Sequence, residues 1–391
     1  MTDDADTAAA RLRLLITALA AGNFAIGMGA FVVIAVLSPI ADDLGMSKAE
    51  AGMVMTVYAV AYAILSPLLV ALTGFAKRRG VLIAGMSIFL AAALVAMLSD
   101  NAAMLFAARI AGALGAGLFT PVAASVAIST STPERRGKAL SAVFFGMTLA
   151  QALGLPVGSF VGYTFGWQAV FGVVAALSAG SLALVLAAMP KQVAFEANTL
   201  ATLGAALVDW RSMLSVLVTA SFTASAYVLY TYLAPLLEQD MGFGRDGVTL
   251  TLLVYGAGAV AGNWLAGMMT DRFGPKATLV LVAITQIALM PVFSFLPVPL
   301  AALGVVTFLW STSGWSFMVP QQARLVRQTP DRQAVVLSLN AAGIYVGASI
   351  GSAIGGQVID AAGLAWLGIV GAACWAASLL HLLLSERVAR R

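Results

Sequence analysis

The sequence of 391 residues carries little charge and almost no histidine or cysteine. Charged residues make up 10% of the chain, whereas a soluble domain carries about 25%. One His and one Cys (His381 and Cys374) exclude a disulfide framework and a metal site built from His and Cys ligands. We therefore expect no metal and no other cofactor, and the shortage of catalytic side chains argues against an enzyme.

Hydrophobic residues are correspondingly abundant, at 61% of the chain. A soluble domain is about 45–50% apolar, so this composition predicts an all-α integral membrane protein. A helix that crosses a bilayer needs about 20 apolar residues. Twelve stretches meet this requirement: 14–38, 49–73, 81–99, 102–129, 139–163, 168–189, 213–237, 248–269, 277–296, 300–323, 335–359 and 364–384.

The Lys and Arg residues are divided unevenly between the two sides of the predicted membrane. With the N-terminus inside, 18 of the 21 fall in cytoplasmic segments, Lys48 and Arg245 fall outside, and Arg109 lies within a span. The positive-inside rule predicts a multi-pass protein of the cytoplasmic (inner) membrane with both termini cytoplasmic. The net charge of +4 follows from this topology and from contact with the lipid bilayer, and we expect no nucleic-acid partner.

The chain repeats itself at half its length. The stretch LGMSKAEAGMVMTVYA (44–59) matches MGFGRDGVTLTLLVYG (241–256) at a shift of 197 residues, and TPERRGKALS (132–141) matches TPDRQAVVLS (329–338) at the same shift. Parallel repeats of this kind build transporters with a site near the bilayer midplane. We predict two six-helix pseudo-repeats: an N-terminal bundle over 1–189, a cytoplasmic linker over 190–211 and a C-terminal bundle over 212–391.

Four blocks of the sequence resemble the major facilitator superfamily. GMMTDRFGPK (267–276) is similar to its signature G-x-x-x-D-R-x-G-x-[RK], and RIAGALGAG (109–117) is similar to the fourth-span motif of proton-coupled members. GLPVGSFVG (154–162) resembles the fifth-span motif of antiporters. LSLNAAGIYVGASIGSAIGG (337–356) resembles the eleventh span of the sugar-, purine- and drug-efflux members. Within the drug:proton antiporter branch, the chain looks like the arabinose and chloramphenicol efflux permeases.

This resemblance implies the major facilitator fold and a monomeric secondary transporter that exports a small organic molecule. The molecule would be sugar-, nucleoside- or drug-like, and transport would proceed by alternating access with protons as the coupling ion. Two departures weaken the implied proton coupling: Gly74 replaces the acid of the first signature copy, and Ala30 stands where many relatives carry a Glu. The alternative is a proton-independent facilitator or exchanger that uses Arg109 to bind an anionic or polar solute.

Arg109 is the one charged residue deep within a predicted span. A guanidinium keeps its proton at any accessible pH, so Arg109 cannot carry the coupling proton. It would bind a polar or anionic group of the substrate, or tune a substrate carboxylate, because charges inside a membrane usually mark a transport pathway. Two structural interpretations are also open: snorkelling to the outer interface, and capping of carbonyl groups that neighbouring glycines leave free.

The motifs supply the other candidates for coupling and gating. Asp271 and Arg272 are expected in the loop after the eighth span, where the acid would cap a helix N-terminus and the pair would latch one conformation. Gly154, Pro156 and Gly158 are expected in the fifth span. Glycines at four-residue spacing, which recur in the eleventh span, let helices approach closely, and proline can kink its helix.

Aromatic and polar residues gather in the spans that, by the resemblance, line a central cavity. A largely apolar pocket with a few polar groups suits a small amphipathic molecule, although aromatic side chains in spans also serve in packing and at the interface. The candidates for substrate binding are Asn23, Phe24, Tyr58, Tyr62, Gln151, Tyr227, Tyr230, Tyr255, Trp310, Trp315, Asn340 and Tyr345.

Overall fold

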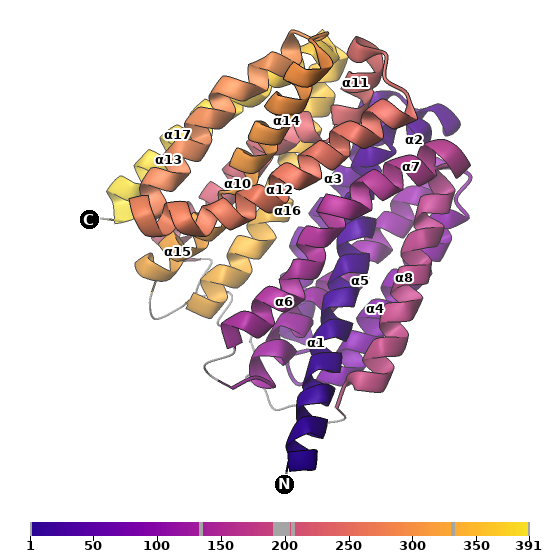
Figure 1. Cartoon of the computed structure of the whole chain (residues 1–391), viewed down its shortest axis with the longest axis vertical. Helices are drawn as coiled ribbons and strands as arrows, with labels where there is room; N and C mark the ends of the chain where they lie inside the picture. The colour runs from indigo at the N-terminus through magenta and orange to yellow at the C-terminus, as the bar shows by residue number, and fades with distance from the viewer. Residues whose placement is uncertain (1, 133–135, 191–203, 205–207, 330–332, 390–391) are drawn as a thin grey trace.

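The computed structural model describes residues 2–132, 136–190, 204, 208–329 and 333–389, and every regular element within these ranges is a helix (Figure 1). Among these residues, twelve helical segments are long and apolar enough to cross a membrane. Their ends differ from those of the twelve predicted spans by at most five residues, so the predicted all-α membrane fold is confirmed. The linker predicted at 190–211 lies almost wholly outside the described residues.

The N-terminal half of the described chain (residues 2–190) contains the first six spans. Its α-helices are α1 (Thr2–Phe31), α2 (Leu37–Asp43), α3 (Lys48–Leu72), α4 (Arg78–Met97), α5 (Ala102–Ser129), α6 (Arg136–Leu149), α7 (Leu155–Phe165) and α8 (Trp167–Ala188). Irregular helices interrupt two of the spans. The 3₁₀ helix η1 (Val32–Ala35) follows α1, and the π-helix η3 (Ala150–Gly154) joins α6 to α7.

The C-terminal half (residues 208–389) contains the other six spans. Its α-helices are α10 (Trp210–Tyr230), α11 (Leu233–Met241), α12 (Arg245–Phe273), α13 (Pro275–Leu289), α14 (Leu300–Trp315), α15 (Met318–Gln328), α16 (Gln333–Ala362) and α17 (Leu367–Ala389). The 3₁₀ helices η4 (Met290–Ser294) and η6 (Leu364–Trp366) complete the ninth and twelfth spans. The seventh span is divided between α10 and α11, and the tenth between α14 and α15.

Local sequence accounts for several helix ends. Ser47 and Glu50 form a reciprocal capping box at the start of α3, and the Asn101 side chain accepts a hydrogen bond from the Met104 amide at the start of α5. Gly166 and Gly274 have φ angles of 90° and 78°. These left-handed conformations favour glycine and let each residue end one helix and begin the next without a loop.

The glycines of the eleventh span confirm the predicted close helix packing. Gly347, Gly351 and Gly355 on α16 face α10, where an added methyl group would collide with the carbonyl oxygens of Ala220, Ala224 and Val228. A side chain at these positions would therefore force α16 away from α10. This contact makes α10 and α16 a closely packed pair within the C-terminal half.

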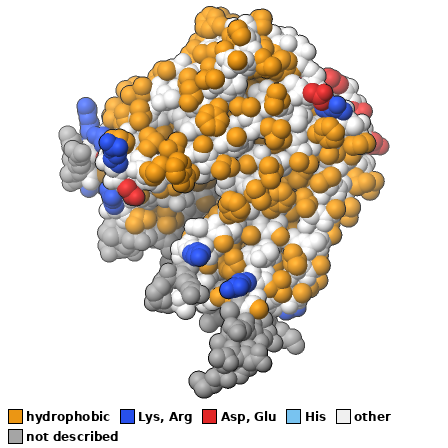
Figure 2. Space-filling model, viewed as in Figure 1, with side chains coloured by type: hydrophobic (Ala, Val, Ile, Leu, Met, Phe, Trp, Pro, Cys, Tyr) orange, Lys and Arg blue, Asp and Glu red, His pale blue; other side chains and the backbone are white. Residues whose placement is uncertain are grey.

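The two halves lie side by side and meet mainly through α3 against α16 and α7 against α12 (Figure 1). Hydrophobic side chains cover most of the face in Figure 2, with Lys and Arg side chains at its lower and left margins and most of its Asp and Glu side chains at the upper right. An apolar band between charged margins is the surface that a bilayer requires. The chain is a multi-pass membrane protein.

Candidate substrate and coupling site

Aromatic rings from both halves stack at the centre of the molecule, and we call this group the tyrosine cluster. Its members are Phe31, Tyr58 and Tyr62 from the N-terminal half and Tyr227, Tyr230, Tyr255, Trp310 and Tyr345 from the C-terminal half. Tyr62 and Tyr345 stack across the interface with ring centroids 3.8 Å apart. Seven of the twelve residues predicted to bind substrate are therefore brought together, and Phe31 joins them without having been predicted.

The cluster has two arms that meet at Tyr227. One arm lies at the interface, where Phe31 contacts Tyr227 and Tyr345 at centroid distances of 6.4 and 6.3 Å. The other arm runs into the C-terminal half, from Tyr227 to Tyr230 (5.5 Å) and from Tyr230 to Tyr255 (4.4 Å). The stacked and edge-on arrangements are those that aromatic rings prefer.

Several hydroxyl groups of the cluster are buried without a partner. The hydroxyls of Tyr58, Tyr230 and Tyr345 make no hydrogen bond with any described residue. The Tyr255 hydroxyl, by contrast, accepts a hydrogen bond of 3.2 Å from the Trp315 indole. Because buried polar groups are normally paired, three unpaired hydroxyls on aromatic rings form a surface suited to a ligand that has both apolar faces and polar groups.

Of the remaining substrate candidates, Trp315 touches the cluster through Tyr255, and the others lie apart from it. Asn23 donates to the Val143 carbonyl and accepts from Thr120, all within the N-terminal half. Asn340 accepts a short hydrogen bond from Thr219 within the C-terminal half. Both side chains thus already join helices of one half. Phe24 is half-buried against the core.

Gln151 is buried on the π-helix η3, and its side-chain oxygen has no partner among the described residues. The π turn stands directly before Pro156, where the sequence predicted a kink. Proline cannot donate to the carbonyl of Ala152 four residues earlier, so the helix widens locally instead. Gly154 and Gly158 on the same span face Met28 and Val32, at the end of α1 and the start of η1.

Arg109 is buried in the N-terminal half and binds backbone carbonyls. Its guanidinium donates to the carbonyl oxygens of Gly29 (2.5 Å), Ala30 (2.7 Å) and Val54 (3.3 Å). It also lies over the Tyr58 ring at 4.2 Å from the centroid, a favourable cation–π position. Gly29 and Ala30 belong to the last turn of α1, directly before η1, and the last carbonyl groups of a helix have no regular partner within it.

This geometry matches the carbonyl-capping interpretation of Arg109 and also places it beside the tyrosine cluster through Tyr58. The adjoining cavity measures only about 20 Å³, which is room for about one water molecule. The backbone carbonyl of Ala30, whose side chain carries no acid, lies in direct contact with the guanidinium. Here the charge is therefore stabilised by carbonyl dipoles, with no acidic side chain of the described residues bonded to it.

The predicted placement of Asp271 and Arg272 is wrong. Both residues are in the last turn of α12, not in a loop, because Gly274 and not the acid ends the helix. Asp271 does not cap the following helix: the N-cap residue of α13 is Gly274, and no side chain caps this helix. Both side chains are exposed, and Arg272 lies over the Phe273 ring at 5.4 Å. Their gating role stays a prediction.

Sequence reasoning missed a buried ion pair. Both residues lie outside the predicted spans 300–323 and 364–384, yet Arg324 on α15 is 3% exposed and pairs with Glu386 on α17 at 2.5 Å. The polar run PQQARLVRQ (320–328), in which Gln321 and Arg324 are three residues apart, is the signal that could have indicated a helix with one polar face turned inward.

The hydrogen bonds between the halves lie at one end of the molecule, which we call the joined end. It contains α2, α7 and α11 (Figure 1). Here Tyr163 donates to Glu238, Arg245 to Thr164, Thr249 to Ser159, and Ser352 to the Gly52 carbonyl. At the opposite end, no hydrogen bond joins the halves among the described residues. The structure is thus held together at the end that the sequence predicts to be external.

Comparison with known proteins agrees with this architecture. A model of the Major Facilitator Superfamily matches residues 19–352. An uncharacterized MFS-type transporter of Bacillus subtilis, YtbD, is 31% identical over 91% of this chain and 92% of its own length. A probable sugar efflux transporter of Pasteurella multocida is 28% identical over 92% of this chain and 88% of its own length.

Solved structures share the fold at low sequence identity. The nucleoside transporter NupG has a TM-score of 0.77 at 13% identity, covering 96% of this chain and 99% of its own. A bacterial homologue of the lysosomal transporter Spinster, in an inward-facing and unoccupied conformation, has a TM-score of 0.70 at 17% identity, covering 97% and 96%. With repeat, fold and relatives in agreement, the chain belongs to the Major Facilitator Superfamily, and it is a membrane transporter of small solutes and not an enzyme.

Proposed function

We propose that this protein exports a small, hydroxyl-bearing organic molecule from the cell by alternating access, in exchange for protons. The observation that carries the proposal is the tyrosine cluster, in which both halves contribute rings and three buried hydroxyls lack a partner. A sugar or a sugar-like molecule fits this surface, because its C–H faces stack on aromatic rings and its hydroxyls pair with the tyrosines.

Two further observations support export. The similarity to a probable sugar efflux transporter extends over nearly the whole of both chains. The predicted orientation, with both termini cytoplasmic, makes the joined end external, so that the central cluster would be reached from the cytoplasm in this conformation. Loading from the cytoplasm is the step with which an export cycle begins.

The alternative of a proton-independent exchanger rests on one observation. Arg109 has no acidic partner among the described residues, and Ala30 occupies the position of the usual carboxylate. The site next to Arg109 therefore offers no side chain that could carry a proton. If this alternative holds, Arg109 serves substrate binding or helix architecture alone.

The test is a flux assay with purified protein in liposomes that contain a pH-sensitive dye. Candidate compounds (pentoses, nucleosides, phenicols and small carboxylates) are added one at a time, and labelled-compound flux is measured beside proton flux. Movement of both substrate and protons supports the proposed antiport. Substrate flux without proton flux supports the exchanger, and no flux of any hydroxylated compound contradicts the proposed substrate class.

Tyr345→Phe tests the role of the unpaired hydroxyls. The substitution removes one hydroxyl that has no protein partner and leaves the stacked ring in place. Loss of one substrate hydrogen bond should raise the KM by about threefold to tenfold without loss of thermal stability. The matched control is Tyr232→Phe, whose hydroxyl already donates to the Ser352 carbonyl at 2.8 Å. That variant should lose stability and keep its KM, and the reverse pattern would contradict the proposed site.

A further inference from the structure

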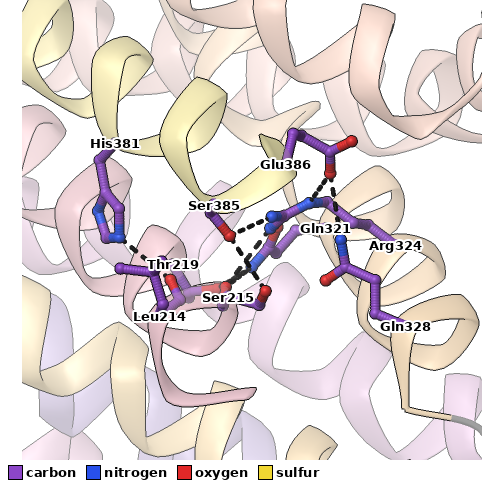
Figure 3. A network of polar contacts seen from close by, with 9 residues as sticks. All are labelled: Leu214, Ser215, Thr219, Gln321, Arg324, Gln328, His381, Ser385 and Glu386. Atoms are coloured by element: carbon purple, nitrogen blue, oxygen red, sulfur yellow. Dashed lines mark hydrogen bonds and ion pairs between the residues drawn. The ribbon is translucent and has the colours of Figure 1, made fainter. Parts of the chain in front are cut away.

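A buried polar network at the end of the C-terminal half opposite the joined end has no role in the transport scheme so far (Figure 3). Its centre is the ion pair between Arg324 on α15 and Glu386 on α17. The Glu386 side chain is 13% exposed and that of Arg324 is 3% exposed. The other two ion pairs between described residues, Lys48–Asp42 and Arg245–Asp246, are far more exposed.

Glu386 is the anchor of this network. It accepts hydrogen bonds from Arg324 (2.5 Å) and from Gln328 (3.2 Å), both of which are on α15. Arg324 also donates to the Ser385 hydroxyl (2.5 Å) and to the Gln321 side-chain oxygen (3.2 Å). The positive charge of Arg324 is buried, and a buried charge is strongly destabilising without a partner of opposite sign. The buried position of the Arg324 side chain therefore depends on the negative charge of Glu386.

The network contacts α15, which is separated from α14, the other helix of the tenth span. A two-residue turn at Ser316 and Phe317 interrupts the tenth span between α14 and α15. Besides the two bonds to Glu386, α15 is tied to α10 through Gln321, which donates to the Ser215 carbonyl at 2.9 Å. The contacts of α15 with α17 are these polar ones, whereas its position beside α10 also depends on the buried Leu325, which packs with Val216 in an apolar cluster.

The network continues toward the centre of the protein. Gln321 donates to the Thr219 hydroxyl at 3.1 Å, and Thr219 in turn donates to Asn340 on α16. Tyr345, a member of the tyrosine cluster, is on the same helix, and α16 packs against α3 of the other half. A shift of α15 would therefore change the contacts of α16, the helix that contributes Tyr345 to the tyrosine cluster and packs against the other half.

We propose that Glu386 is the proton-binding residue of this transporter, an inference that rests on the proposed exchange for protons. In the structure described here, the ionised carboxylate holds α15 in place through Arg324, which is the state after the proton has left. Protonation of Glu386 removes the counter-charge of a buried guanidinium, so α15 separates from α17 and the hydrogen-bond chain to Asn340 is interrupted. The missing carboxylate beside Arg109 is thereby replaced by one in the other half.

Other titratable groups face this region from the packed helices. His381 on α17 contacts the Leu214 carbonyl at 3.1 Å (Figure 3). Its other ring nitrogen contacts the Ser221 hydroxyl, also at 3.1 Å. Further charged side chains on the elements around the pair are Asp209, Arg211, Asp271, Arg272, Lys276, Arg327 and Arg387. None of the described cations except Arg324 comes within ion-pair distance of Glu386. His381 is therefore the competing candidate for a proton-dependent effect.

The decisive variant is Glu386→Gln, which keeps the shape and one acceptor oxygen but cannot ionise. In the liposome assay, we expect substrate-driven proton flux to be lost while labelled-substrate exchange continues and no longer depends on pH. Glu386→Asp should restore the proton flux. Asp100→Asn, at an exposed acid beside the start of α5, serves as the control and should behave as the wild type.

A second measurement does not need the substrate. In a Cys374→Ser background, the half-buried Ala323 on α15 is replaced (Ala323→Cys), and its rate of labelling by a thiol reagent is followed against pH. As the pH falls, release of α15 should raise the labelling rate once that rate is corrected for the fraction of thiolate. Glu386→Gln should abolish this rise. Labelling that loses its pH dependence in His381→Gln but keeps it in Glu386→Gln would overturn the proposal.

The two proposals fail in different ways. A wild-type protein that moves substrate without protons refutes the proposed antiport, whatever the variants do. Proton flux in the wild type that persists unchanged in Glu386→Gln refutes the role of Glu386 and leaves the antiport standing.

Discussion

Arg109 binds backbone carbonyls and also lies beside the proposed substrate site, so a structural role and a functional role are both compatible with its position. Its three hydrogen bonds reach two helices at once, to Gly29 and Ala30 on α1 and to Val54 on α3. The planar fork of a guanidinium suits such divergent acceptors, whereas an ammonium group is a point donor. Shape as well as charge therefore matters at this position.

Arg109→Lys separates these two properties. We expect the variant to insert in the membrane but to lose about 1–3 kcal/mol of unfolding free energy, because at least one buried carbonyl is left unpaired. Transport should fall along with stability, and Arg109→Ala should abolish transport. Thermal unfolding and flux are measured together, with Arg327→Lys at an exposed position on α15 as the control. Wild-type stability in Arg109→Lys would contradict the carbonyl-capping geometry.

At the residue scale, the sequence indicated which types of side chain form the candidate site, but it did not indicate which side chains contact each other. The tyrosines of spans two, seven, eight and eleven were selected as aromatic residues within spans, and they do meet. Arg324 and Glu386 stand just beyond the predicted spans 300–323 and 364–384, so nothing in the sequence pattern indicated that they are buried. Their burial depends on how α15 packs against α10 and α17, which no local pattern of either segment specifies.

At the scale of elements, the interruptions of helices are the features with most consequence. The π-helix η3 follows from Pro156, a local cause that the sequence contains. The change from α1 to η1 has no proline or glycine at its centre, and its freed carbonyls are bound by a residue about 80 positions away in the chain. The first kind of break is predictable, and the second depends on tertiary contacts.

The π-helix also lies at a contact between the halves, which Gly256→Ala tests. A methyl group at Gly256 on α12 would lie 2.5 Å from the Ala152 carbonyl oxygen and 2.8 Å from its Cα. Because both atoms belong to backbone, the halves must separate at this level, so the variant should disfavour the conformation described here. We expect lower transport and faster thiol labelling of a partly buried Thr249→Cys reporter at the joined end.

Gly267→Ala is the matched control on the same helix, since a methyl group there would meet nothing within 4 Å. Both substitutions raise helix propensity equally, so a difference between them reports the contact. Equal labelling in the two variants would show that α12 does not need this close approach.

At the scale of the whole molecule, composition and repeat predicted the twelve spans to within a few residues, because the bilayer fixes both the length and the polarity of each helix. Which conformation the halves adopt was not predictable from the sequence. The contacts that define it, such as Thr249 with Ser159 and Ser352 with Gly52, pair residues of ordinary type in different halves. Such pairs leave no periodic signal in either segment.

If the halves move as units, a covalent link at the joined end should stop transport. The hydroxyl oxygens of Ser159 on α7 and Thr249 on α12 are 3.0 Å apart, so cysteines at these positions can form a disulfide with little movement. In a Cys374→Ser background, oxidation of the Ser159→Cys, Thr249→Cys double variant should abolish flux, and reduction should restore it. The reason is that the link prevents this end from opening.

A link within one half is the matching control for this experiment. The hydroxyls of Ser225 on α10 and Ser378 on α17 are 2.9 Å apart, and both belong to the C-terminal half. A disulfide between Ser225→Cys and Ser378→Cys should leave transport intact, because rigid-body movement does not change distances inside a half. Loss of flux in this variant alone would mean that α10 and α17 move against each other during transport. Only inhibition by the cross-half link, with none from the other, identifies opening of the joined end as an obligatory step in the cycle.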